Sequence, residues 1–269
     1  MKAFMINMLF RKMTTNGLIN GGMNLTPDEH MCWSEVFAYS KLGPIQGKVV
    51  PKFIDAFMVK SPKFTKGENM AIAMSYVKGG SVTEMCQELG SDKDPDPGLW
   101  YPIGLEMIRA VYAVHQQGVA GFHVRDANML VEKLDPPVSA NDSDSCQSHS
   151  RYAIKIIDFA CASSCDYAHG DGGPIGDQQE AINDVDDLAL LIGEICGTLD
   201  RIPLGSDIYG ASRRRSEFLK WVKKNHGQER CVQALWPALE TSTYDDYTPW
   251  IKTDSLPNIL RSLRSKGDV

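Results

Sequence analysis

The chain has 269 residues, of which 43% are hydrophobic and 23% are charged, and its formal net charge is −6. This composition is ordinary for a globular protein with a sizeable core, and it excludes fibrous and disordered classes. The negative charge argues against a nucleic-acid partner, because proteins that bind the phosphate backbone carry an excess of lysine and arginine. The seven cysteines are scattered and odd in number, which favours a reducing compartment over a disulfide framework.

The amino-terminal residues predict neither a secretion signal nor a membrane anchor. The apolar stretch from Ala3 to Phe10 is short, is interrupted by Asn7 and lacks a small-residue cleavage pattern. No stretch of the sequence is long and apolar enough to span a membrane. We therefore expect a cytoplasmic protein with no membrane partner.

A helix is predicted from Pro27 to the residues before Gly43-Pro44. It opens with Thr26-Pro27-Asp28-Glu29, a capping box with proline at the first helical position. Glu35 lies on an apolar face of this helix, so its carboxylate needs a cationic partner. The residues that share this face are Met31, Glu35, Tyr39 and Leu42.

Two strands, a turn and a second helix follow. The strands are predicted over Lys52 to Val59 and Met70 to Val77, and Lys78-Gly79-Gly80 is predicted as the turn. The helix is predicted from Pro102 to Gln117, and Gly118 ends it.

The segment Gly121-Phe122-His123-Val124-Arg125-Asp126-Ala127-Asn128 leads into the apolar run of a short strand. It resembles the catalytic loop of protein kinases, H-R-D-L-x-x-x-N, counted back from Asn128. In that register Gly121 stands in place of the histidine, and His123 in place of the aspartate that accepts a proton. Arg125 stands where the family has a basic residue facing phosphate, and Asn128 where it has a magnesium ligand.

A further strand, Ala153 to Ile157, runs into Asp158-Phe159-Ala160. These residues resemble the Asp-Phe-Gly motif that places a carboxylate on the magnesium of the nucleotide, with Ala160 in place of the glycine. The resemblance implies that Asp158 binds magnesium. The alternative is a carboxylate that caps a turn at the end of the strand.

The run from Asp184 to Ile192 resembles the long buried helix of the same family, whose opening aspartate ties the catalytic loop down from beneath. Asp184 would be that tether. One apolar stripe is expected to be buried, and its members are Leu188, Leu191, Ile192 and Ile195.

The remaining segments carry less chemistry. Leu134 to Ser150 is rich in Asp, Ser and Pro and is predicted to be a surface insertion. Ser163 to Gly176 is glycine-rich and lacks the Ala-Pro-Glu of a kinase activation segment. Helices are predicted over Ser212 to Asn225 and around Leu256 to Leu263. The run Arg213-Arg214-Arg215 in the first of these is interpreted as solvated helix surface.

In this order, the pieces resemble the protein-kinase-like superfamily, particularly its divergent fungal and aminoglycoside-phosphotransferase-like members, over roughly residues 1 to 200. The resemblance implies an α+β, two-lobed fold. Residues 1–77 would form a truncated β-rich amino lobe with one helix, and 78–269 a mainly helical carboxyl lobe with an insertion at 134–150. It also implies ATP and Mg²⁺ as cofactors, with adenine meeting the backbone near Ser75 and Val77 and the phosphates oriented through Glu35.

Two parts of the family pattern are not evident, namely the glycine-rich loop and the strand lysine that pairs with the helix glutamate. Lys2 and Lys12 are candidates for the lysine, and Gly17 and Gly21-Gly22 lie after the first apolar stretch rather than before it. Either the first strands were lost or the chain starts late. A lobe without them exposes a sheet edge, which predicts a protein partner.

These observations favour a pseudokinase that acts by partner binding, with at most weak nucleotide binding. One alternative is a low-activity phosphotransferase acting on a protein or small-molecule hydroxyl, with His123 as a substitute base and Arg125 on the transferring phosphate. Losing the base alone costs about 10²–10⁴-fold in rate, because kinase chemistry rests mainly on positioning and charge neutralisation. A further alternative is an accessory protein of a specialised pathway that keeps only the fold.

Overall fold

The computed structural model describes six stretches of the chain, and the following paragraphs concern these alone. The predicted cap at Thr26, the candidate lysines Lys2 and Lys12, the insertion after Leu134 and the helix near Leu256 lie outside them. The described residues are 27–60, 68–82 with 84, 85 and 88, 97–134, 151–164, 175–199 and 213–241.

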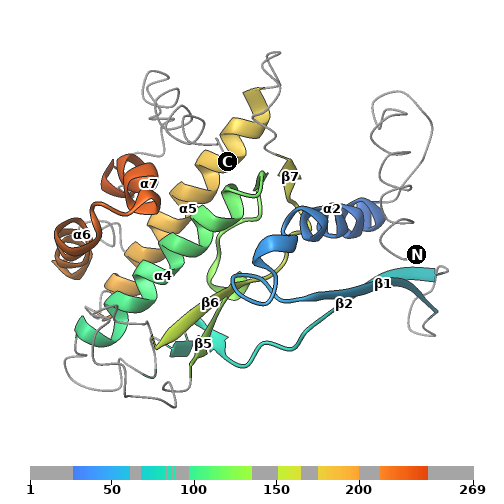
Figure 1. Ribbon diagram of the computed structural model, residues 1–269, viewed down its shortest axis with the longest axis horizontal. Helices are drawn as coiled ribbons and strands as arrows, with labels where there is room; N and C mark the ends of the chain where they lie inside the picture. The colour runs from blue at the N-terminus through green and yellow to red at the C-terminus, as the bar shows by residue number, and fades with distance from the viewer. Residues whose placement is uncertain are drawn as a thin grey trace.

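The amino-terminal part is one helix above a two-stranded antiparallel ribbon (Figure 1). Helix α2 spans Pro27–Lys41, and the ribbon consists of β1 (Phe53–Lys60) and β2 (Glu68–Met74). As predicted, the helix ends before Gly43, where a short 3-10 turn, η1 (Gly43–Ile45), takes over. The apolar face of α2 is buried through Val36, Ala38, Tyr39 and Leu42, whereas Met31 is 44% exposed.

Strand β2 ends at Met74, three residues before the predicted end at Val77. The ladder stops because Ser75 caps it: its N–H donates to the carbonyl of Lys52 at 2.8 Å, and its hydroxyl accepts the N–H of Lys52 at 2.9 Å. The residues from Ser75 to Lys78 are therefore an irregular connection rather than strand.

The centre of the molecule is a three-stranded antiparallel sheet in the order β3-β5-β6. Its strands are β3 (Gly80–Ser81), β5 (Met129–Lys133) and β6 (Tyr152–Ile156), and the last two were predicted. Gly79 is required here, because a Cβ on it would lie 2.1 Å from the carbonyl oxygen of Val131. A second small pair, β4 (Val119–Ala120) with β7 (Ser163–Ser164), was not predicted, since two-residue strands leave no periodic pattern.

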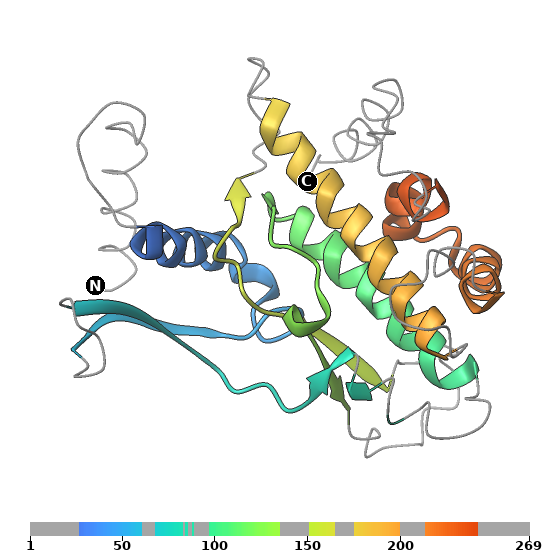
Figure 2. The same ribbon diagram turned by 180° about the vertical axis from the view of Figure 1, so that it is seen from behind.

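Four helices form the carboxyl-terminal part of the described structure. Helices α4 (Pro97–His115) and α5 (Ile175–Leu199) run side by side, and α6 (Arg213–His226) and α7 (Arg230–Thr241) lie against them on the side away from α2 (Figures 1 and 2). Helix α4 begins five residues before the predicted Pro102, and α5 begins nine residues before Asp184. Helix α7 was not predicted.

The core is continuous across the sheet and these helices. Its largest fully buried side chains are Tyr39, Phe122, Phe159, Phe218, Leu42, Ile103, Met107, Ile108, Met129, Ile156, Leu188 and Ile192. The predicted buried stripe of α5 is confirmed, because Leu188, Leu191, Ile192 and Ile195 are all buried.

The interpretation of Arg213-Arg214-Arg215 as solvated surface was wrong for two of its members. Arg214 and Arg215 are buried, and Nη2 of Arg215 donates to the carbonyl of Leu239 at 2.8 Å. Burial lowers the pKa of Arg215. Arg215 therefore joins α6 to α7, and neither of the two buried arginines forms a basic face.

The predicted α+β class is confirmed, with the β-ribbon toward the amino terminus and the helices toward the carboxyl terminus. Among the described helices, none combines the length and the apolar character that crossing a membrane requires.

Candidate functional site

The loop after β4 is fastened from beneath by Asp184 of α5. Asp184 is 1% exposed, and its Oδ2 accepts the N–H of Gly121 at 2.8 Å and lies 3.1 Å from Nε2 of His115. The predicted tether is therefore confirmed, although Asp184 lies in the middle of α5 rather than at its opening. Gly121 has a φ of +71°, and a Cβ on it would lie 3.3 Å from Oε2 of Glu180, which explains the glycine.

The other end of the loop is braced by Asn128. Its Nδ2 donates to the carbonyl of His123 at 3.1 Å, and the residues between them include the 3-10 turn η2 (Asp126–Asn128). His123 has a φ of +49°, a left-handed conformation that costs most residues about 1–2 kcal/mol. Strained residues of this kind cluster at functional sites.

Asp158 and Asn128 are brought together by the pairing of β5 with β6. Met129 lies opposite Ile156, and the next N–H, that of Ile157, donates to the carbonyl of Asn128 at 2.9 Å. Asn128, just before β5, and Asp158, just after β6, therefore lie at the same end of the ladder. Asp158 is exposed, has a φ of +65° and caps its own turn by accepting a long, 3.4 Å hydrogen bond from the N–H of Ala160.

Carboxylate and amide oxygens suit a hard cation such as Mg²⁺, which keeps several water ligands and binds substrate phosphates besides. Among the described residues, no group of three His, Cys, Asp or Glu side chains could hold a metal ion by itself. Asp158 and Asn128 could each supply one oxygen ligand to such a cation.

Glu35 of α2 reaches this site. Burial raises its pKa, the charge of Asp158 raises it further, and a hydrogen bond from the backbone N–H of Phe159 lowers it. Within the described stretches, no lysine or arginine pairs with Glu35. The predicted cationic partner of Glu35 thus stays a prediction.

An aromatic column connects α2 to α4 through this site. Tyr39 packs against Phe53 and Phe159, with ring centroids 5.7 and 5.5 Å apart. Phe159 contacts Phe122 at 5.5 Å, and Phe122 contacts His115 at 5.7 Å. Phe159 is fully buried, so this packing fixes the backbone on which Asp158 stands.

The connection after β2 contains the predicted adenine-binding backbone. The carbonyl of Ser75 and the N–H of Val77 take part in none of the hydrogen bonds found among the described residues. The next residues form a reciprocal capping box. The N–H of Ser81 donates to Oε2 of Glu84, and the N–H of Glu84 donates to the hydroxyl of Ser81.

His123 and Arg125 lie close enough to α5 for their charges to act on Asp187. Burial raises the pKa of Asp187, Asp184 raises it further, and His123 and Arg125 lower it. Arg125 is exposed. The predicted roles of both residues in phosphate transfer stay predictions.

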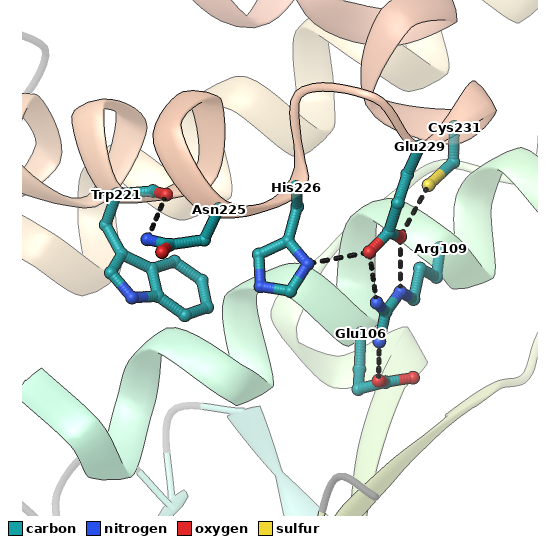
Figure 3. A network of polar contacts seen from close by, with 7 residues as sticks. All are labelled: Glu106, Arg109, Trp221, Asn225, His226, Glu229 and Cys231. Atoms are coloured by element: carbon teal, nitrogen blue, oxygen red, sulfur yellow. Dashed lines mark hydrogen bonds and ion pairs between the residues drawn. The ribbon is translucent and has the colours of Figure 1, made fainter. Parts of the chain in front are cut away.

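A second polar cluster, on the far side of α4, was missed by sequence reasoning (Figure 3). Arg109 forms a two-pronged contact with Glu229, Nε to Oε2 at 2.9 Å and Nη2 to Oε1 at 2.6 Å, and it also binds Glu106 at 2.7 Å. Nδ1 of His226 lies 2.6 Å from the same glutamate. Burial raises the pKa of the adjoining Cys231 thiol to about 11, which disfavours the reactive thiolate form.

No family model matches the chain. A stretch of 71 residues, 26% of the chain, is 31% identical to the serine/threonine-protein kinase ppk31 of Schizosaccharomyces pombe, and it spans only 6% of that protein. A solved structure, WaaP in complex with acyl carrier protein, is 18% identical with a TM-score of 0.40, over 71% of this chain and 73% of that one. About a quarter of the chain is thus similar in sequence to a protein kinase.

Proposed function

We propose that this is a degenerate protein-kinase-like protein, a pseudokinase that binds ATP and Mg²⁺ weakly and acts by binding a protein partner. The observation that carries the proposal is at position 123. The loop that Asp184 and Asn128 fasten at its two ends holds an imidazole where a kinase would present a carboxylate. A weakened proton acceptor on a preserved frame favours binding over transfer.

Nucleotide binding is supported by groups on both sides of the site. The backbone of Ser75 and Val77 offers an acceptor and a donor to an adenine edge. Asp158 and Asn128 would hold Mg²⁺, which would neutralise phosphate charge. A cation at this site would also offset the charge of Asp158 that contributes to the raised pKa of Glu35, which gives the protein a physical reason to bind one.

A protein partner is supported by exposed apolar side chains of the ribbon, among which the neighbours Phe57 and Met58 point to opposite faces. Ile54, Phe57 and Met58 of β1 are 63%, 49% and 51% exposed. A two-stranded ribbon is marginally stable alone, and exposed apolar residues on it favour contact with another surface. The partner would thus cover the sheet rather than enter the loop region.

The low-activity phosphotransferase is the second candidate, and the placement of Asn128 beside Asp158 favours it. Because transfer depends largely on positioning and metal charge, retained cation ligands permit a slow reaction even without a carboxylate base.

A thermal-shift measurement tests the proposal. With ATP and Mg²⁺ at about ten times the Kd, the melting temperature should rise by roughly 3–5 °C. Asp158→Asn should abolish the rise, and Glu240→Gln, a matched loss of one carboxylate on the exposed face of α7, should leave it unchanged. If the melting temperature does not rise at millimolar ATP, the proposal that the protein binds nucleotide is wrong.

Phosphate transfer separates the two candidates. Purified protein with labelled ATP should transfer no phosphate to itself or to a generic protein acceptor. Measurable transfer that disappears in His123→Ala would instead establish the phosphotransferase, with the imidazole as its base.

A further inference from the structure

We propose that Asp187 of α5 is a positioning residue that dictates which side chain position 123 can carry. Its carboxylate favours a basic residue there, and an aspartate at position 123 is tolerated only when Asp187 is neutralised. This inference rests on the proposed function, in which the loop occupies the place of a kinase catalytic loop.

The first step is the face that α5 presents to the loop. Glu180, Asp184 and Asp187 are spaced at i, i+4 and i+7, so they share one side of the helix. Two of the three lie beside Gly121 of the loop. Glu180 lies 3.3 Å from the place of a Cβ on Gly121, and Asp184 accepts the N–H of the same glycine. Asp187, one turn further along, therefore faces the following residues of the loop.

The second step is the charge around Asp187. It is half-buried, so its carboxylate is partly removed from water and depends on nearby cationic groups. The acids beside it are Asp184 and Glu180, and the basic groups that act on it are His123 and Arg125. The two loop residues are thus the basic groups beside an otherwise acidic surface.

The third step concerns the backbone of position 123. Its φ of +49° is left-handed, and histidine and aspartate are both among the residues enriched in that region. The backbone therefore accepts either side chain. What discriminates is charge, because an aspartate would remove one basic group and add a carboxylate opposite Asp187.

The consequence is that position 123 of the loop and position 187 of α5 are coupled. Restoring an aspartate at position 123 alone would place it against three acids of α5 and would distort or loosen the loop. Restoring it together with a neutral residue at position 187 would allow the carboxylate to face the site.

The test measures thermal unfolding without ligand in four variants. His123→Asp should lower the melting temperature by at least roughly 2–4 °C, the effect of about 1 kcal/mol in a chain of this size. His123→Asn, similar in size but uncharged, should lower it less. His123→Asp with Asp187→Asn should return it toward the His123→Asn value, whereas His123→Asp with Asp186→Asn, a charge removed at the neighbouring helix position, should not.

A second readout separates positioning from mere stability. Transfer of phosphate from Mg-ATP should appear in the His123→Asp, Asp187→Asn pair and be absent or at least tenfold lower in His123→Asp. A His123→Asp protein as stable as the parent, or a pair no more stable than His123→Asp, would overturn the inference. A missing Mg-ATP shift in every variant would instead overturn the proposed function, because the melting temperatures without ligand still report on Asp187.

Discussion

Two clusters of acids in this molecule have opposite electrostatic settings. On the far side of α4, Glu229 receives Arg109 through two contacts and His226 through a third. The hydrogen bond from Arg109, more than any other effect, lowers the pKa of Glu229 to about 2. At the candidate site, burial raises the pKa of Glu35, and the charge of Asp158 raises it further.

The opposite pKa shifts of Glu229 and Glu35 distinguish a structural ion pair from a candidate binding site. A carboxylate that is fully paired within the chain fixes two elements relative to one another and has nothing left to offer a ligand. Carboxylates that are brought together without a cation among the described residues cost folding free energy, and perturbed groups of this kind mark binding sites. The loop from Gly121 to Asn128 combines both properties. Asp184 holds it through contacts within the chain, yet it lies beside the candidate site.

The largest expected effect comes from removing the tether. Asp184→Ala leaves the N–H of Gly121 and the ring of His115 without their buried acceptor, which should cost about 3 kcal/mol in the free energy of unfolding. Urea denaturation measures it, with Asp186→Ala as the matched control. A loss below about 1 kcal/mol would show that the loop is held by packing instead.

Removing Arg109 should cost less, because its ion pair is about a third exposed. We expect Arg109→Ala to lower the free energy of unfolding by about 2 kcal/mol, after allowance for solvent screening. Lys220→Ala, which removes an exposed cation from α6, is the control and should be nearly neutral.

The same variant should change the dependence of stability on pH. The pKa of Glu229 is depressed from 4.5 to about 2 in the folded protein, so its contribution is present above about pH 4.5 and is lost as the pH falls toward 2. Arg109→Ala should flatten this part of the acid unfolding curve. An unchanged curve would mean that other carboxylates govern acid unfolding.

The smallest expected effect has the opposite sign. Because the folded pKa of Glu35 is raised, this residue favours folding below its unfolded pKa and opposes it at pH 7. Glu35→Gln should therefore raise the free energy of unfolding at pH 7, by less than about 1 kcal/mol for a group that water partly screens. The same variant should weaken the Mg-ATP shift. A loss of stability would indicate that Glu35 has a cationic partner in the folded protein.

The sequence by itself determined the elements with strong local signals. Helices α2 and α6 end where glycine follows them, and β1, β5 and β6 lie on apolar runs, because caps and periodicity act within a few residues. The same locality explains the errors. Helix α7 has Pro237 inside it, which argues against a helix unless packing compensates. The end of β2 depends on a bond from Ser75 back to Lys52, 23 residues away.

The resemblance pointed to Asp184, Asn128 and Asp158, but only the tertiary structure decided which groups each of them contacts and how the other charges are paired. Asp158 and Asn128 meet because β5 and β6 pair in one register, and the Asp184 tether exists because α5 crosses beneath the loop. Arg109 and Glu229 are 120 residues apart, and their sequence surroundings give no sign of one another. Likewise, nothing near His123 in the sequence points to Asp187. Electrostatic energy depends on the distance between charges and on their burial, and neither can be predicted from the local sequence.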